Sequence, residues 1–430
     1  MDWTRLPDLA AVALLTCAFA SVARQGTTTG SKPWLVGWVL ITFHFAALLF
    51  LKFPALLGDL ASAIGVACLT AGGALFMWAA VPYRNEPSSQ WMLIAQLGTN
   101  TCYAILISSD NVSPWALNVS AVLLGLAPLA IALVSLKEFS HPMRWALVVA
   151  YLFLSAFLLM VQHRPQIGPK LALNGLLFSV YGGCCLNIWY SYRRFSAGAL
   201  ITIVGFCGWA FVFLISPFAD KLMPNPPIQS EVLNLPKFVV AVGMILLLLE
   251  DQIEHNKYLA LHDELTGLPN RRLFLDRLAL ALERSRRTGT KSALLVVDLD
   301  NFKQVNDSLG HHAGDLLLQR VSSLFSSRIR RSDTVARTGG DEFSVVLEEP
   351  TSTSNAELVA RSLLQLLEEP VQLLERQYKV GASIGIAVYP DDAADMEALC
   401  IFADMQMYES KKSSRDRSQT PILATPSPPA

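Results

Sequence analysis

The chain has 430 residues, of which 52% are hydrophobic and only 16% charged, and its net charge is -1 at pH 7. This composition excludes an ordinary soluble protein, which needs far less apolar side chain. No long basic stripe stands out, so we expect no nucleic-acid partner. About a third of the charged residues lie in the first 250 residues, which divides the chain into a lipid-soluble part and a water-soluble part.

Apolar windows recur through the first 250 residues, each about 17 to 25 residues long and able to cross a bilayer as a helix. They lie at 7–23, 34–52, 58–82, 91–109, 114–136, 143–161, 170–190, 197–217 and 235–250. We predict an all-α membrane bundle over residues 1–250 with nine spans, eight being the alternative. His44 and Asp59 are polar residues within these windows and are therefore candidates for a functional role.

The connector between the two parts, residues 246–262, predicts a continuous helix that leaves the membrane. Leu249, Ile253, Asn256 and Ala260 follow a heptad-like spacing, which would let the helix pair with its copy in a dimer. A solvated surface helix is equally compatible with this periodicity.

The water-soluble part, residues 258–417, alternates strand and helix patterns and predicts an α+β domain with an antiparallel-rich sheet. The expected elements are a buried strand at 293–299, a helix at 312–330, a hairpin around Gly339-Gly340, a helix at 355–369, a strand at 379–388 and a helix at 395–412. Residues 418–430 are rich in Pro, Ser and Thr, which predicts a disordered tail.

Acidic residues come from two separate stretches of this domain. Asp298 ends the buried strand, while Asp341 and Glu342 follow Gly339 and Gly340 at the tip of the hairpin. If the two strands are neighbours, these carboxylates form an oxygen cage for one or two magnesium ions that neutralise a nucleoside triphosphate. The Gly-Gly-Asp-Glu run by itself is also compatible with an ordinary polar hairpin.

Other polar residues have the chemistry to bind the rest of such a nucleotide. Asp315 can accept hydrogen bonds from the N1–H and N2 amino groups of guanine, which adenine does not offer, and Asn306 can pair with the remaining edge. Lys411 and Arg415 are one helical turn apart and can both face a terminal phosphate.

Six ordered motifs resemble those of GGDEF-domain diguanylate cyclases over roughly the last 40% of the chain. They lie at 263–272, 298–307, 310–315, 337–343, 383–387 and 408–415. The resemblance implies the palm-like nucleotidyl-cyclase fold. It also implies that Asp298, the Leu299 carbonyl, Asp341 and Glu342 hold Mg²⁺ or Mn²⁺, and that one carboxylate of the last pair takes the proton from the attacking hydroxyl.

The resemblance further implies that Asn306 and Asp315 bind the guanine of GTP. The other implied substrate ligands surround the phosphates: Asn301, Phe302, Lys303, Gly339, Gly340, Lys411 and Arg415. An Arg-x-x-Asp pair before the hairpin, Arg330 and Asp333, resembles the product-inhibition site of the family, with Arg361 as a second arginine. An ordinary surface pair is the alternative.

The implied reaction joins two GTP molecules, one on each domain of a homodimer, into cyclic di-GMP and two pyrophosphates. The domain and the linker helix would both form the dimer, and the membrane region would act as a sensor. An inactive receptor for cyclic di-GMP and a transporter with a regulatory domain are the alternatives. Because GTP is cytoplasmic, we expect the domain on the inner side of a bacterial cytoplasmic membrane and, with nine spans, the N-terminus outside. The basic residues of the loops favour this orientation only weakly.

Overall fold

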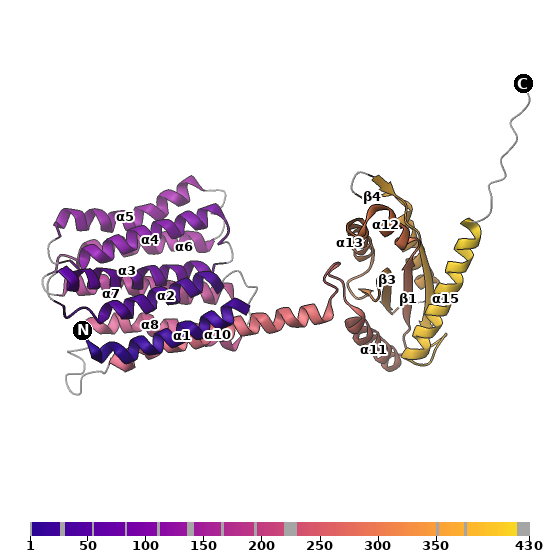
Figure 1. Ribbon diagram of the computed structural model, residues 1–430, viewed down its shortest axis with the longest axis horizontal. Coiled ribbons are helices and arrows are strands. Elements are labelled where there is room, and N and C mark those ends of the chain that lie inside the picture. Colours follow the sequence, from indigo (N-terminus) through magenta and orange to yellow (C-terminus); the bar gives the residue numbers. More distant parts are fainter. Residues whose placement is uncertain are drawn as a thin grey trace, which may run out of the picture. The chain divides into compact units, whose positions relative to one another are not determined.

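The computed structural model divides into two compact units, Met1–Glu254 and His255–Ala430 (Figure 1). Each unit is described by itself. The described residues are 2–25, 31–53, 56–81, 84–109, 112–135, 142–164, 167–192, 196–218, 230–349, 352–373 and 376–418.

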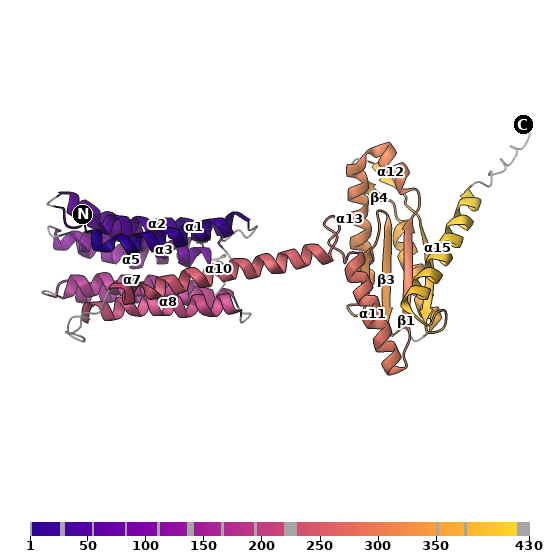
Figure 2. The ribbon, with the colours of Figure 1, turned by 60° about the horizontal axis from the view of Figure 1, so that its bottom comes forward.

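Long helices that run side by side build the first unit (Figure 2). They are α1 (Leu6–Gln25), α2 (Ser31–Leu48), α3 (Leu56–Ala79), α4 (Pro87–Ile107), α5 (Pro114–Val134), α6 (Pro142–Val161), α7 (Gly168–Ser191), α8 (Ala197–Ile215) and α10 (Ser230–Leu261). Two short 3₁₀ turns, η1 (Trp3–Arg5) and η2 (Ser216–Phe218), flank α1 and α8. One of these helices occupies most of each window predicted from the sequence.

Seven of these helices in the described part of the chain are long and apolar enough to cross a membrane. The two others are α2 and α4, so the structure supports seven spans by length and composition, and the count of nine stays a prediction. Helix α4 is less apolar because one of its faces carries Ser88, Gln96 and Asn100, and all three side chains are buried in the bundle. His44, on α2, has its Nδ1 atom 2.8 Å from the Gly65 carbonyl oxygen.

Aromatic side chains fill the centre of the bundle. The ring centroids of Tyr181 and Trp209 are 4.2 Å apart, and those of Trp38 and Phe76 are 5.3 Å apart. All four side chains are fully or almost fully buried. Because lipid tails are as apolar as these side chains, close packing rather than hydrophobic burial holds such helices together.

Helices α8 and α10 approach so closely that glycine is required between them. A Cβ atom at Gly205 would lie 2.7 Å from the Val240 backbone nitrogen, and one at Gly243 would lie 2.5 Å from that of Thr202. Glu250, near the other end of the contact, accepts a hydrogen bond from the Gly198 backbone N–H at 3.1 Å. Helix α10 is thus fixed against α8 along its apolar length, and it then continues without interruption to Leu261.

The second unit contains a four-stranded antiparallel sheet of order β2-β3-β1-β6 and a separate two-stranded sheet, β4-β5. Its strands are β1 (Ser292–Leu299), β2 (Thr334–Arg337), β3 (Glu342–Glu348), β4 (Val371–Leu373), β5 (Arg376–Tyr378) and β6 (Ala382–Tyr389). Its helices are α11 (Arg271–Thr288), α12 (Phe302–Leu309), α13 (His311–Arg328), α14 (Thr353–Glu368) and α15 (Met396–Ser418).

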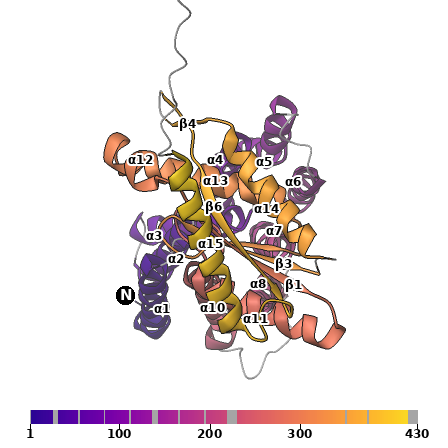
Figure 3. The ribbon, with the colours of Figure 1, turned by 90° about the vertical axis from the view of Figure 1, so that its right-hand side faces the viewer.

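Central strand β1 is buried on both faces, and alternate residues belong to two different cores. Leu295 and Val297 pack with α13 and α14, whereas Leu294 and Val296 pack with α11 and α15. Side chains alternate in this way because the side-chain period of a strand is two. Figure 3 shows α15 lying along β6 on one side of the sheet.

The α+β domain was predicted correctly, with small errors in its boundaries. Helix α13 ends at Arg328 rather than at residue 330, and β6 begins at Ala382 rather than at 379. The sequence analysis did not predict α11, α12 or the β4-β5 hairpin. A start signal for α11 was available, because the Asn270 side chain accepts hydrogen bonds from the first turn. The tail predicted at 418–430 lies almost wholly outside the described residues.

The close contact of α8 with α10 predicts different effects of two alanine substitutions on the same helix. Gly205→Ala would force the α10 backbone away and lower the stability by about 1–3 kcal/mol. Gly208→Ala is the matched control, since its Cβ would meet only Pro236 at 3.4 Å, an ordinary contact. Thermal unfolding of both full-length variants in detergent measures the difference. Equal melting temperatures would contradict the described packing.

Candidate functional site

The antiparallel pairing of β1 with β3 brings the predicted carboxylates together. In its register Asp298 lies directly opposite Glu342, and the Leu299 backbone N–H donates a hydrogen bond to the Asp341 carbonyl oxygen at 3.2 Å. Asp298 is only 7% exposed, Asp341 is half-buried and Glu342 is exposed. Acidic groups from two distant stretches therefore meet at one end of the sheet, as the sequence predicted for neighbouring strands.

Burial and the negative charge of its neighbours raise the pKa of Glu342. Desolvation is the largest cause, followed by the charges of Asp298, Asp341 and Asp404, and Lys411 opposes them. Such a cluster favours a bound cation, because a positive charge removes the mutual repulsion of the carboxylates.

Asp404, on α15, is a member of this cluster that the sequence analysis missed. Desolvation raises the pKa of its carboxyl group, and the nearby Arg271 opposes the increase. A signal was present in the sequence. Asp404 lies seven residues before Lys411 on a predicted helix, and this separation places the two side chains on one face.

Lys411 lies on the same cluster. Its Nζ atom donates a hydrogen bond to the Asp298 Oδ1 atom at 2.5 Å and forms an ion pair with it. The predicted phosphate ligand thus stands beside the predicted metal ligand. Arg415, its predicted companion, belongs to α15, but its side chain lies outside the described residues.

Arg337 holds the loop between β2 and β3 in place. Its guanidinium donates hydrogen bonds to both Asp263 carboxylate oxygens, at 2.9 and 3.1 Å, and to the Gly340 carbonyl oxygen at 2.7 Å. Burial alone would raise the pKa of Asp263, but hydrogen bonds from Thr266 and Arg337 outweigh it and lower this pKa. The sequence analysis assigned no role to Arg337 beyond its place in a motif. Its contacts connect the first motif of the domain to the Gly-Gly loop.

The two glycines of this loop have different surroundings. A Cβ atom at Gly339 would lie 2.7 Å from the Glu342 Oε2 atom, so glycine leaves room there for the carboxylate itself. At Gly340 a Cβ atom would meet nothing within 4 Å. Of the two, only Gly340 therefore presents an open backbone to an approaching group, whereas the sequence analysis assigned the same role to both.

Asn306 and Asp315, the predicted guanine ligands, are placed together by helices α12 and α13. A Cβ atom at Gly314 would lie only 2.0 Å from the Asn306 Oδ1 atom, so this amide occupies the space that a side chain at Gly314 would need. Asp315 is the next residue and is exposed near the start of α13, just after its first turn. The two polar side chains therefore flank the same helix turn.

The N-terminus of α12 follows directly on β1. Asn301 precedes the helix in the left-handed conformation, with a φ of 58°, and Phe302 is its first residue. Lys303 is exposed in the same turn. The first backbone N–H groups of a helix have no partner within it and favour anions, which suits the predicted role of this segment beside phosphates.

The predicted inhibitory residues are not joined by side-chain contacts. The Asp333 Oδ1 atom accepts a hydrogen bond from the Glu348 backbone N–H at 3.1 Å, and Arg361 pairs with Glu357 at 3.5 Å on the surface of α14. Asp333 and Arg361 thus form these contacts with residues other than Arg330. The Arg330 side chain is exposed.

The acidic cluster suits a magnesium ion that is shared with substrate phosphates better than a metal ion that is bound by protein side chains alone. Within the described ranges, no group of three or more His, Cys, Asp or Glu side chains has an arrangement that would hold a metal ion. Mg²⁺ is commonly bound by only one or two carboxylates together with substrate phosphates and water. Asp298, Asp341 and Glu342 provide such a partial set.

Comparison with known proteins identifies the family of this domain. The family profile described as "Diguanylate cyclase, GGDEF domain" matches residues 260–417. The crystal structure of the GGDEF domain of TpbB from Pseudomonas aeruginosa is 39% identical, and the match covers 34% of this chain and 92% of that domain, with a TM-score of 0.34. The chain belongs to the GGDEF-domain family. Its GGDEF domain follows a region of apolar helices of the kind expected for a membrane sensor.

Diguanylate cyclases are among the curated relatives of this GGDEF protein. Diguanylate cyclase TpbB from Pseudomonas aeruginosa is 37% identical over 179 residues, 41% of each chain. The bifunctional diguanylate cyclase/cyclic di-GMP phosphodiesterase MucR of the same organism is 36% identical over 235 residues, 51% of this chain and 33% of that protein. The chain thus spans less than half the length of these relatives. Its GGDEF domain is homologous to diguanylate cyclases, which use divalent metal ions.

The raised pKa of Glu342 predicts that Glu342→Gln stabilises the metal-free protein at pH 7. Ionised Glu342 is disfavoured in the folded state by desolvation and by its acidic neighbours, and the unfolded chain lacks this penalty. Because the folded pKa lies above the ordinary value of 4.5, the penalty exists above the folded pKa and disappears as both states become protonated. The melting temperature should therefore rise at pH 7 and converge with that of the wild type near pH 3.5.

Scanning calorimetry of the full-length protein with a chelator tests this expectation. Glu283→Gln is a matched control, since Glu283 is an exposed carboxylate on α11. A lower melting temperature for Glu342→Gln at pH 7 would show that the carboxylates do not repel one another.

Proposed function

We propose that this protein is a diguanylate cyclase that condenses two GTP molecules into cyclic di-GMP and two pyrophosphates. The observation that carries the proposal is the position of Asp298 opposite Glu342, with Asp341 adjacent. Homology to diguanylate cyclases supports the same activity. A purified full-length protein incubated with GTP and Mg²⁺, with products separated by chromatography, tests it.

In this proposal Asp298, the Leu299 carbonyl, Asp341 and Glu342 hold Mg²⁺ or Mn²⁺, with phosphate oxygens completing the ligand set. The metal supplies the positive charge that neutralises the triphosphate. One carboxylate of the Asp341/Glu342 pair accepts the proton of the attacking 3′-hydroxyl. The rest of the catalysis is positioning and charge stabilisation.

Lys411 exchanges partners when substrate binds. In the structure its ammonium group pairs with Asp298, a carboxylate that the metal would take over. The ammonium group is then available to a terminal phosphate, together with Arg415. Gly340, Asn301, Phe302 and Lys303 surround the remaining phosphate oxygens, and Gly339 leaves room for Glu342.

Guanine is recognised by Asn306 and Asp315. An Asp carboxylate accepts hydrogen bonds from N1–H and the N2 amino group together, and adenine has neither donor at these positions. The position of the Asn306 amide against Gly314, the residue before Asp315, supports this assignment. The substrate is therefore GTP rather than ATP.

Two chains are required, because each domain holds one GTP and each 3′-hydroxyl attacks the α-phosphorus of the other. The domain and α10 form this homodimer. Leu249 and Ile253 are exposed on α10 at a spacing of four residues, which suits pairing with a second copy. A single chain would be inactive.

The helical unit is proposed to anchor the enzyme in the bacterial cytoplasmic membrane, with the GGDEF domain on the side that contains GTP. It senses a stimulus and acts on the cyclase through α10. Arg330, Asp333 and Arg361 bind the product and inhibit synthesis.

Removal of the hairpin carboxylates tests the metal role. Replacing Asp341 and Glu342 together with Ala should reduce cyclic di-GMP synthesis by about a thousandfold or more, because the metal charge is worth several kcal/mol in the transition state. Glu283→Ala is the matched control, and inserted, folded protein is verified by thermal unfolding. Synthesis at the wild-type rate in the double variant would refute the assignment.

Product inhibition is tested at Arg330. Arg330→Ala should increase the cyclic di-GMP concentration for half-inhibition by about tenfold, since a charged hydrogen bond to phosphate contributes about 1.5–3 kcal/mol. The neighbouring exposed residue provides the control variant Arg331→Ala, which should leave inhibition unchanged. Identical inhibition curves for both variants and the wild type would remove Arg330 from the site.

A further inference from the structure

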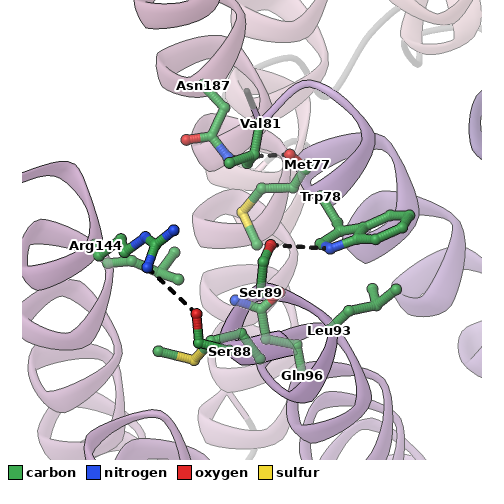
Figure 4. A pocket seen from close by; sticks show the side chains of 11 residues that line it. Met77, Trp78, Val81, Ser88, Ser89, Leu93, Gln96, Arg144 and Asn187 are labelled. Atoms are coloured by element: carbon green, nitrogen blue, oxygen red, sulfur yellow. Dashed lines mark hydrogen bonds between the residues drawn. The ribbon is translucent and has the colours of Figure 1, made fainter. Parts of the chain in front are cut away.

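A small polar cavity lies inside the helical unit between α3, α4, α6 and α7. Its volume is about 40 Å³, and its polar lining comprises Trp78, Ser88, Ser89, Gln96, Arg144 and Asn187 (Figure 4). Asn187 lies in the last turns of α7 and Arg144 in the first turn of α6. The cavity is therefore at the end of the bundle where α8 begins and where Glu250 of α10 is bound.

Most polar groups of this cavity already have partners. Trp78 Nε1 donates to the Ser89 Oγ atom at 3.1 Å, and Asn187 Nδ2 donates to the Met77 carbonyl oxygen at 3.0 Å. Arg144, only 4% exposed, donates to the Ser88 Oγ atom at 3.3 Å and forms an ion pair with Glu86. Since this pair cancels the charge of Arg144, the polar end of the cavity has no net charge.

Gln96 is an uncharged member of this lining. Its side chain is 2% exposed, and its Nε2 atom has no hydrogen-bond partner among the residues that the structure describes. A buried donor without a partner is unfavourable unless a ligand or a water molecule accepts its hydrogen bond. The cavity therefore offers a neutral donor to a ligand.

A second, larger cavity adjoins the first. Its volume is about 440 Å³, it lies between α6, α7 and α8, and it is lined mainly by apolar side chains such as Leu154, Phe178 and Phe211. Met77, Leu147 and Asn187 line both cavities, so the two are direct neighbours. A volume in the range of about 300–1,000 Å³ is typical of sites for small organic ligands.

We propose that the two cavities together bind one neutral, membrane-soluble molecule that carries a carbonyl group, the chemistry of a lipid-soluble quinone. Its carbonyl oxygen accepts a hydrogen bond from Gln96 Nε2, and its apolar portion fills the larger cavity. An anionic head group is disfavoured, because Arg144 is already neutralised by Glu86. The proposal concerns binding alone and stands whether or not the GGDEF domain makes cyclic di-GMP.

Three probes test this on the full-length protein in phosphatidylcholine nanodiscs by equilibrium dialysis. They are decyl-p-benzoquinone, decylbenzene, which lacks the carbonyl, and dodecanoate, which is anionic. The quinone should bind saturably and about tenfold more tightly than decylbenzene, the difference of one hydrogen bond. Equal affinity for quinone and decylbenzene, or tighter binding of dodecanoate at pH 8, would overturn the proposal.

Variants locate the site. Gln96→Leu removes the donor at similar volume and should reduce quinone affinity to that of decylbenzene, while Gln90→Leu, an exposed residue of the same helix, should have no effect. If Gln96→Leu does not fold, Leu147→Trp narrows the junction of the cavities and should weaken quinone binding in its place. Unchanged quinone binding in whichever of these two variants folds would place the quinone elsewhere.

Discussion

The register of β1 against β3 brings together negative charges that lie far apart in the unfolded chain. Asp298 faces Glu342 across the ladder, and Asp341 is bonded through its backbone to Leu299. The apolar side chains of both strands fix this register, because a shift by one residue would turn every side chain to the other face. Burial of the sheet on both faces therefore stabilises an arrangement of carboxylates that is unfavourable until a cation is bound.

The sequence was sufficient to predict this convergence, but not all of the groups that take part. The strand at 293–299, the hairpin and the three carboxylates follow from local pattern and motif. Asp404 and Arg337 act through contacts with residues far away in the chain, and local pattern does not report such contacts. Likewise, the different surroundings of Gly339 and Gly340 depend on where the Glu342 side chain lies, which only the folded loop determines.

In the helical unit, hydropathy predicted the helices but not how polar residues are accommodated. Helix α4 buries a stripe of polar side chains against α6, where Asn100 donates to the Tyr151 hydroxyl at 3.0 Å and Tyr103 to the Gln162 Oε1 atom at 3.0 Å. Polar groups inside a membrane are tolerated when they face other helices and form hydrogen bonds. A helix with such a stripe is less apolar by composition, which explains why α4 is not among the seven membrane-crossing candidates in the described part of the chain.

The end of α10 is connected to the Gly339-Gly340 loop by a short series of contacts within the second unit. Asn270 Nδ2 donates a hydrogen bond to the Ala260 carbonyl oxygen at 2.9 Å, and the Asn270 backbone N–H donates one to the Leu261 carbonyl oxygen. Asp263 follows two residues after the helix and binds Arg337, which in turn holds the Gly340 carbonyl oxygen. These bonds connect the residues that follow α10 to the loop that precedes Glu342, so the first motif of the domain and the acidic cluster share one hydrogen-bonded framework.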